Sequence, residues 1–473
     1  MSLRKGSLWV GLVLAGVVSG LPTPEGLPYD AQLTAAVAVL MAVWWVFDSL
    51  PRAVTSLVPL VAFPVMGIQT LGVSAASYAH PLLYLMLGGF VMGAAMERVG
   101  LHERLVALVL QPHWIRINPR RILAALMLAT AGLSGLVSNT ATTLMLLPLA
   151  VSLGRGCDSV PAFVLGLAYA ASIGGMSTLI GTPPNAVLAG MSPDLAGVEI
   201  GFAGWLLVGI PAVLLLLPAA WWVLTRMAFE VPESSGAAAD APTVPAWREG
   251  EQRVLWIVVG AFVLWLARAE KDLGVVTLPG WGPWFDGKGS ELDAGVAMLT
   301  AIVLFAVPLG RNTLTWREVE SSIPWGVLLL LGGGFSLAGA VASSGLTAWI
   351  ASGADAVAGW PTWLTVSLIC TAITFVTELT SNTATTQIAL PLLAEAATRA
   401  GVAPLAWMIP ATLSASCAFM MPVATAPNAI AAEAGGVSTA DMVRGGLVLN
   451  MAGVAVLTVI GVGWVPWAFG LVG

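Results

Sequence analysis

Charged residues are scarce in this chain. Lys and Arg number 19, and Asp and Glu 25, so only 9% of the 473 residues are charged, against roughly 25% in soluble domains. So few charges cannot cover a water-facing surface, which excludes a soluble globular protein. The formal net charge of −6 rests on too few groups to indicate a charged macromolecular partner, and we expect no nucleic-acid binding.

Cysteine and histidine are also rare, with three of each. Cys157, Cys370 and Cys417 stand at no metal-ligating spacing and lie in or beside apolar segments, so we interpret them as small buried side chains. The apolar segments contain no Ser-His-Asp set, no HExxH motif and no cluster of carboxylates. These absences argue against an enzyme.

Apolar residues dominate instead. Hydrophobic types make up 58% of the chain, the mean hydropathy is +0.90, and the 20 Trp suit the membrane–water interface. An apolar helix of about 20 residues crosses the ~30 Å hydrocarbon core of a bilayer. We therefore predict an all-α polytopic membrane protein with about eleven transmembrane helices, at 7–22, 31–47, 53–69, 80–97, 159–191, 201–225, 254–268, 293–309, 324–342, 402–434 and 445–469.

The placement of arginine predicts the orientation. The Arg-containing connections 98–121, 227–253 and 311–323 fall on one side, which the positive-inside rule assigns to the cytoplasm. The N-terminus is then cytoplasmic and the C-terminus external, in the inner (plasma) membrane of the cell. Lys271 and Lys288 do not follow this rule, because they lie in a loop that is predicted to be external. The loops expected outside are 23–30, 191–200 and 269–292.

A polar hexamer occurs twice in this apolar chain. SNTATT stands at Ser138–Thr143 and again 243 positions later at Ser381–Thr386. Each copy is followed at the same interval by a Pro-Asn string, because 46 residues separate Asn139 from Asn185 and also Asn382 from Asn428. The predicted topology runs the two halves through the membrane in opposite directions, so the repeat is inverted. Interrupted segments at matching places of an inverted repeat indicate a secondary transporter with a binding site at the midplane.

The repeat divides the chain into four predicted parts. Residues 1–78 form N-terminal scaffold helices, and 227–323 form a linker with further scaffold helices. Each repeat then contains an apolar stretch too long for one span, which we interpret as a re-entrant hairpin, and a helix unwound at its Pro-Asn string. The first repeat, 79–226, has its hairpin at 122–153 and its unwound helix at 159–191; the second, 324–473, has them at 362–397 and 402–434.

Such breaks suit two kinds of ion. Helix N-termini carry free N–H groups and partial positive charge, which favour a carboxylate or sulfate. Freed carbonyls and the oxygens of Ser, Thr and Asn are hard neutral ligands for Na⁺. Small polar residues can also serve only helix packing, which is the interpretation we keep for the paired GGF strings at Gly88–Phe90 and Gly333–Phe335.

Paired SNT motifs in inverted hairpins, each followed by an unwound helix with a Pro-Asn turn, resemble the divalent anion/sodium symporter (DASS) family, which includes the bacterial INDY-type dicarboxylate transporters. The resemblance covers nearly the whole chain. It implies a homodimer in the lipid bilayer whose transport domains move as elevators against a scaffold, importing C4-dicarboxylates such as succinate, malate or fumarate together with Na⁺.

The resemblance also implies the site residues. The first sodium site corresponds to Ser134, Ser138, Asn139 and Gly181, and the second to Thr377, Thr380, Asn382 and Ala424. Ala426 departs from the family pattern, since some relatives have Pro there, which affects the local turn. The residues implied to hold the dianionic substrate are Ser138, Asn139, Thr140, Thr182, Ser381, Asn382, Thr383 and Thr425.

Sodium coupling is expected because the motifs lie in stretches with almost no basic residue. Arg155 is the only Lys or Arg between Arg121 and Arg226, and none lies between Arg317 and Arg399. A dianion then needs cations that travel with it. The alternatives are a sodium-independent exchanger, a proton-coupled carrier, sulfate or citrate as cargo, and a channel or sensor on the same fold. Glu378 beside the second hairpin tip is a proton carrier, a cap for backbone groups of the tip, or a residue that bonds to the scaffold.

Overall fold

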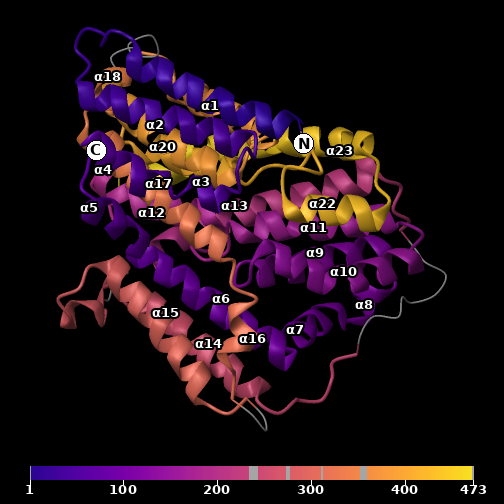
Figure 1. Ribbon diagram of the computed structural model, residues 1–473. Helices are drawn as coiled ribbons and strands as arrows, with labels where there is room; N and C mark the ends of the chain where they lie inside the picture. The colour runs from indigo at the N-terminus through magenta and orange to yellow at the C-terminus, as the bar shows by residue number, and fades with distance from the viewer. Residues whose placement is uncertain (1, 234–242, 273–276, 310–312, 352–358, 471–473) are drawn as a thin grey trace.

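The structure is a computed structural model that describes residues 2–233, 243–272, 277–309, 313–351 and 359–470 (Figure 1). It is helical apart from two short antiparallel strands, β1 (Lys271–Asp272) and β2 (Thr277–Leu278). The all-α prediction holds for the remaining regular structure of these residues. Part of the predicted linker, 234–242, lies outside the described residues.

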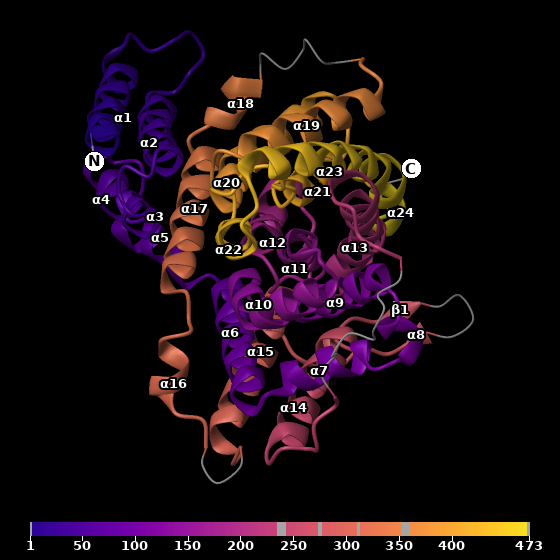
Figure 2. The ribbon, with the colours of Figure 1, turned by 90° about the vertical axis from the view of Figure 1, so that its right-hand side faces the viewer.

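The N-terminal helices form a layer at one edge of the molecule (Figures 1 and 2). They pack on α17 (Trp325–Ser343), with Trp45 and Phe63 fully buried between them. The predicted span at 53–69 is interrupted at residues 56–57, between α3 and α4. Pro59 lies in the first turn of a helix that ends at Gly67, whose φ of 74° is left-handed, so only nine residues are continuous. The helices of this layer are α1 (Ser2–Gly20), α2 (Tyr29–Val46), α3 (Arg52–Thr55), α4 (Val58–Met66), α5 (Leu71–Ala76) and the 3₁₀ turn η1 (Ser77–Ala79).

Two stretches of the chain contain similar series of helices, each with a hairpin followed by a broken helix. The first is α6 (Pro81–Val99), α7 (Leu101–Leu110), α8 (His113–Arg116), α9 (Pro119–Ser134), α10 (Asn139–Gly156), α11 (Val160–Gly175), α12 (Pro183–Ala196), α13 (Phe202–Val223) and the π-helix η2 (Leu224–Ala228). The second is α17, α18 (Leu346–Ala351), α19 (Thr362–Thr377), α20 (Asn382–Arg399), α21 (Leu405–Ser414), α22 (Ala426–Gly435), α23 (Thr439–Val459), the π-helix η5 (Ile460–Trp464) and α24 (Val465–Ala468).

The two hairpins correspond residue by residue. The helix pair α9 and α10 begins and ends at residues 119, 134, 139 and 156, and the pair α19 and α20 at 362, 377, 382 and 399. Every boundary is therefore displaced by the 243 positions that separate the two hexamers. The predicted interruptions are also present, since α11 and α12 are separated by residues 176–182 and α21 and α22 by 415–425.

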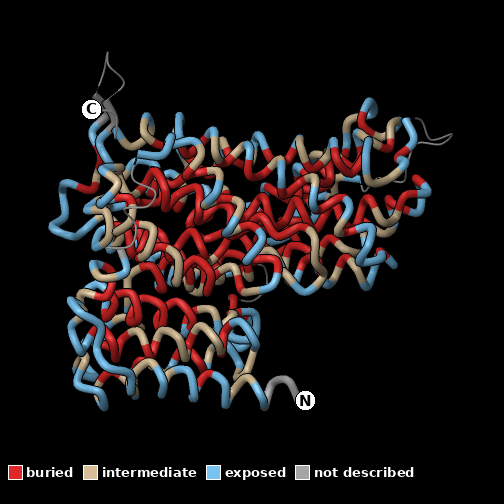
Figure 3. The backbone as a smooth tube through the Cα atoms, turned by 90° about the horizontal axis from the view of Figure 1, so that it is seen from above, coloured by how far each residue is buried: buried red, intermediate tan, exposed pale blue. Residues whose placement is uncertain are grey.

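The remaining helices join the two sets. They are α14 (Glu251–Leu266), the 3₁₀ turn η3 (Gly282–Trp284), α15 (Gly289–Ala306) and α16 (Trp316–Glu320). Helix α15 packs closely on α6, because a Cβ at Gly88 would lie 2.6 Å from Ala297 Cβ, which supports a packing role for the first GGF string. Buried residues concentrate inside the helix layers (Figure 3).

Several helices are long and apolar enough to cross a membrane. The helical segments that satisfy both criteria among the described residues are Tyr29–Val46, Leu71–Val99, Phe202–Ala228, Gly289–Ala306, Trp325–Ser343 and Thr439–Ala468. Shorter apolar helices include α11, α19 and α21, which belong to the hairpins and broken helices. The fold thus has several membrane-crossing helices.

Candidate functional site

The turn of each hairpin ends at an SNT string, and we call Ser138–Thr140 the first tip and Ser381–Thr383 the second tip. In the first tip, Ser138 is the N-cap of α10 and its Oγ accepts a hydrogen bond from the backbone N of Ala141 at 3.2 Å. In the second, Ser381 holds the same position before α20 without a side-chain cap. Serine at this position ends the turn and starts the helix.

Each tip asparagine is held from behind by a hydroxyl. Ser134 Oγ donates to Asn139 Oδ1 at 2.7 Å and lies equally close to the carbonyl oxygen of Ala171. Thr377 Oγ1 repeats this arrangement, at 2.6 Å from Asn382 Oδ1 and 2.9 Å from the carbonyl oxygen of Ala415. The same pair of contacts in both halves fixes both asparagine side chains against a broken helix.

The asparagine of each Pro-Asn string braces the break in its helix. Asn185 Nδ2 donates to the carbonyl oxygens of Gly175 at 3.0 Å and Thr178 at 2.7 Å. Asn428 Nδ2 donates to those of Ala418 at 2.8 Å and Met421 at 3.1 Å. Carbonyls that lose their helical partners thus gain a side-chain donor. Sequence reasoning noted the strings without giving these two asparagines a role; their equal spacing was the available signal.

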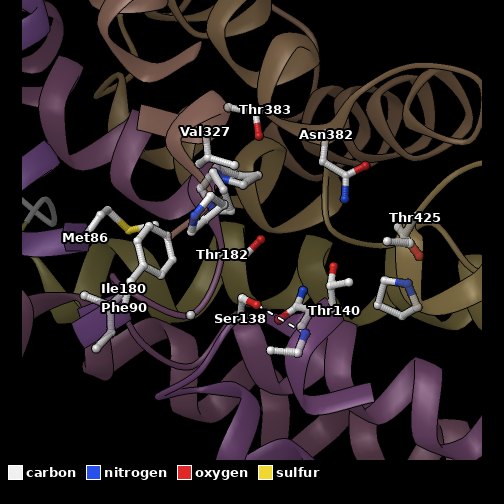
Figure 4. Close-up of a pocket in the computed structure, with 18 of the residues that line it drawn as sticks. Met86, Phe90, Ser138, Thr140, Ile180, Thr182, Val327, Asn382, Thr383 and Thr425 are labelled. Atoms are coloured by element: carbon white, nitrogen blue, oxygen red, sulfur yellow. Dashed lines mark hydrogen bonds between the residues drawn. The ribbon is translucent and has the colours of Figure 1, made fainter. Parts of the chain in front are cut away.

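Four helix starts meet at one cavity of about 630 Å³. Its lining includes the N-cap residues of α10, α20, α12 and α22, which are Ser138, Ser381, Thr182 and Thr425. Figure 4 shows the first tip and the second tip on opposite sides of this space. Each start contributes partial positive charge. Free N–H groups are fewer at α12, which begins with Pro183 and Pro184, and at α22, whose second residue is Pro427, because proline has no N–H. The predicted substrate residues that line the cavity are Ser138, Asn139, Thr140, Thr182, Ser381, Asn382, Thr383 and Thr425, which is the whole predicted set.

The predicted cation ligands divide into three groups. Ser138, Asn139, Gly181, Asn382 and Ala424 line the cavity. Ser134 and Thr377 are buried behind the tips, where they contact the two asparagines as described above. Thr380 is separate, because its hydroxyl lies 2.6 Å from Thr385 Oγ1 and bonds to the carbonyl oxygen of Val376.

Oxygens gather around the amide of Asn139. One amide atom lies 2.7 Å from Ser134 Oγ, 3.1 Å from the Ala171 carbonyl oxygen and 3.3 Å from the Gly181 carbonyl oxygen. Such a group of neutral oxygens is matched either by the amide NH₂ or by a hard cation. Among the described residues there is no cluster of three His, Cys, Asp or Glu, so the donor chemistry suits Na⁺ rather than a transition metal.

The first site has no room for side chains at two glycines. A Cβ at Gly175 would lie 2.4 Å from Asn139 Oδ1, and one at Gly181 would lie 2.5 Å from the carbonyl oxygen of Gly175. Alanine stands at the matching places of the second half, Ala418 and Ala424. The two predicted cation sites therefore have similar ligand types but differ in packing.

Glu378 binds backbone groups of the second broken helix. Oε1 accepts from the N–H groups of Phe419 and Met420 at 2.8 Å, and Oε2 from Met421 at 2.9 Å. The amide of Asn450 on α23 adds a bond of 2.7 Å. The capping role is therefore the one the contacts support. Gly135 stands at the matching position of the first half, so this carboxylate is particular to the second.

Glu378→Gln is expected to destabilise the protein by about 1–3 kcal/mol, because an amide NH₂ in place of one oxygen leaves at least one buried backbone N–H without an acceptor. The measurement is thermal unfolding of the detergent-solubilised protein. Glu395→Gln is the matched control, since Glu395 forms an exposed ion pair with Arg399 at 3.3 Å on α20. Equal unfolding temperatures for the two variants and the wild type would refute the capping role.

The expectation that no fixed cation approaches the motifs is wrong at one place. Arg52 of α3 lines the same cavity as the two tips, together with Ser321, Ser322 and Pro324 before α17. It is the one charged side chain in that lining among the described residues. Sequence reasoning missed it because it considered basic residues near the motifs along the chain, and Arg52 lies far upstream of both.

The family profile of the citrate transporters (CitMHS) matches residues 42–412. The chain belongs to the citrate transporter family. Relatives named sodium-dependent dicarboxylate transporter SdcS match nearly its full length: that of Staphylococcus saprophyticus is 32% identical over 98% of this chain and 92% of the relative, and that of Staphylococcus aureus is 33% identical over 95% and 90%. These matches confirm the predicted family resemblance. They also confirm the expectation that this chain is a transporter and not an enzyme.

Two solved structures share the fold. The YdaH transporter of Alcanivorax borkumensis superposes with a TM-score of 0.61 at 14% identity, covering 94% of this chain and 100% of that one. MtrF of Neisseria gonorrhoeae, described as representing a class of antimetabolite efflux pumps, superposes with a TM-score of 0.59 at 15% identity, covering 96% and 97%. These structures show the fold, whereas the family profile and the near-full-length relatives show that the chain is a multi-pass membrane transporter.

Proposed function

We propose that the protein imports C4-dicarboxylates such as succinate, malate or fumarate together with Na⁺. The observation that carries the proposal is the cavity in which four helix N-caps and both tip asparagines meet. Helix N-termini, hydroxyls and amide N–H groups offer donors to carboxylates, whereas hydroxyl and carbonyl oxygens offer ligands to Na⁺. The near-full-length relatives named sodium-dependent dicarboxylate transporters support this pairing.

The dicarboxylate is proposed to bind between the two tips, and one Na⁺ behind each of them. At least two Na⁺ accompany each dianion, and more than two if transport moves net charge inward. The proposed first sodium site consists of Ser134, Ser138, Asn139 and Gly181, and the second of Thr377, Thr380, Asn382 and Ala424. The proposed substrate residues are the eight predicted ones that line the cavity.

Sodium-independent exchange is the second candidate, because Arg52 supplies a positive charge to the cavity wall. Its Nε bonds to Asp48 Oδ1 at 3.0 Å, and both side chains are 43% exposed. Seen from the tips, the carboxylate of Asp48 offsets most of the positive charge of Arg52. A dianion bound between the tips therefore still needs cations that arrive with it. Citrate, which the family description names, and sulfate are less favoured cargoes.

The experiment that tests the proposed function is uptake of labelled succinate by proteoliposomes. We expect an inward Na⁺ gradient to drive accumulation, with unlabelled malate and fumarate competing more strongly than citrate or sulfate. Sulfate or citrate competing better than the C4-dicarboxylates would contradict the proposed cargo.

Transport is proposed to follow the elevator mechanism in a homodimer, with eleven spans, two re-entrant hairpins and inverted repeats. The corresponding hairpins and broken helices of the two halves support the repeat. Its inversion requires the two halves to cross the membrane in opposite directions, and the distribution of arginine favours a cytoplasmic N-terminus and an external C-terminus.

That topology predicts opposite labelling of two engineered cysteines. Pro112→Cys, before α8, is expected to react only from the cytoplasm, and Gly287→Cys, before α15, only from outside. Both are made in a background without Cys157, Cys370 and Cys417, which are buried and free. A membrane-impermeant maleimide applied to intact cells and to inverted vesicles makes the measurement. Reaction of both cysteines from the same face would overturn the inverted arrangement.

A further inference from the structure

Arg52 joins the cavity to the N-terminal layer of helices. It begins α3, which lies beside the start of α17 (Figure 2), and a Cβ at Gly326 would be only 3.5 Å from Ala53 Cβ. Its carbonyl oxygen accepts from Ser56 N at 3.0 Å, from Ser56 Oγ at 2.8 Å and from Trp45 Nε1 at 3.4 Å. The backbone of Arg52 is thus fixed to the N-terminal layer and not to the hairpins that carry the tips.

The guanidinium keeps donors available. Among the described residues its one hydrogen bond is from Nε to Asp48 Oδ1, which leaves the two Nη groups for another acceptor. A guanidinium binds a carboxylate with two parallel N–H groups. The pair with Asp48 is 43% exposed on both sides, and exposed pairs of this kind are weak, so an incoming carboxylate can compete with Asp48.

We propose that Arg52 is a further substrate-binding residue, in addition to the eight at the tips and broken helices. It holds one carboxylate of the dicarboxylate at the cytoplasmic entrance of the cavity, and this inference rests on the function proposed above. Other residues of the same lining, Ser321, Ser322 and Pro324, precede α17. The connection 311–323 falls on the face that the distribution of arginine assigns to the cytoplasm. Arg52 therefore assists the dicarboxylate as it leaves the tips or enters from inside.

This placement makes the effect of Arg52 depend on the side of the membrane. If the tips move relative to the N-terminal layer during transport, their distance from Arg52 differs between the two states. A group that contacts the substrate in one state stabilises the substrate-bound form of that state alone. Arg52 thus contributes to substrate affinity from the cytoplasmic side and not from outside.

Sided transport kinetics test the proposal. Succinate KM is measured in intact cells for the external side and in inverted membrane vesicles for the cytoplasmic side. Arg52→Gln is expected to raise the cytoplasmic KM roughly fivefold, as expected for loss of one charge–charge contact in a water-filled cavity, and to leave the external KM unchanged. The cytoplasmic effect should shrink in high KCl, since salt screens exposed charges. Arg52→Lys keeps the charge but lacks the two parallel N–H donors, so its cytoplasmic KM should lie between those of the wild type and Arg52→Gln.

Two further variants separate binding from structure. Asp48→Asn removes the competing carboxylate and is expected to lower the cytoplasmic KM. Arg399→Gln is the matched control, because Arg399 forms an ion pair with Glu395 at the same i,i+4 spacing and lies outside the cavity lining; both of its KM values should match the wild type. Equal changes on both sides in Arg52→Gln, or no change on either, would overturn the proposal. If the wild type transports no dicarboxylate, the proposed function itself is refuted. If the wild type is active but Arg52→Gln changes the cytoplasmic and external KM equally, or changes neither, only this inference is refuted.

Discussion

Asn139→Ala and Asn382→Ala are each expected to reduce sodium-driven succinate uptake by about a hundredfold or more, because hydrogen bonds to charged groups contribute roughly 1.5–3 kcal/mol each and every substitution removes at least two polar contacts to ions. Both side chains line the cavity and are held from behind by a hydroxyl, Ser134 or Thr377. The loss affects substrate and cation together, since an amide has both an acceptor and a donor.

Each variant removes one half of a symmetric arrangement, so neither tip can substitute for the other. If only one of the two tips binds the substrate and the cations, only one of the two substitutions abolishes uptake. We expect both to do so, while the protein still inserts and dimerises. The measurement is initial uptake of labelled succinate at matched protein levels.

The control is a third asparagine with a purely structural contact. Asn118 caps α9 through its side chain, which accepts from Arg120 N at 2.9 Å, and it does not line the cavity. Asn118→Ala should lower stability by about 1 kcal/mol, as expected for a lost cap, with uptake near the wild-type rate. A wild-type uptake rate in either tip variant would contradict the site assignment.

Much of the fold could be predicted because its signal is periodic and repeated. The hexamers, 243 residues apart, predict both hairpins, and α9, α10, α19 and α20 follow with boundaries displaced by the same number. The prolines at 183, 184 and 427 predict the two broken helices, since proline cannot continue a helix in its interior. The interruption within the segment 53–69 was not predicted, because hydrophobicity alone does not show that α3 ends at Thr55 and α4 begins at Val58.

The candidate site was predictable only where it lies in the motifs. All eight predicted substrate residues line one cavity. Arg52 could not be placed there, because its approach depends on how α3 packs against α17. The partners of Glu378 are likewise fixed by tertiary packing, since Phe419, Met420 and Asn450 are remote in sequence.

The second large effect concerns Na⁺. A dicarboxylate brings two negative charges to a cavity whose one charged lining residue among the described residues, Arg52, is already paired with Asp48. Helix N-termini supply only about half a charge each, and moving uncompensated charge into a low-dielectric site costs several kcal/mol. Cations that bind with the substrate remove that cost. The neutral oxygens of Ser134, Ala171 and Gly181 suit Na⁺.

Replacing Na⁺ by K⁺ or choline at fixed pH is the most direct measurement of the central claim. In proteoliposomes containing the wild-type protein, we predict that succinate uptake falls to the level of protein-free liposomes. We also predict that uptake rises sigmoidally when Na⁺ is restored, since we propose that at least two Na⁺ bind for each dianion. Undiminished, saturable uptake without Na⁺ would contradict symport and leave an exchanger or a proton-coupled carrier.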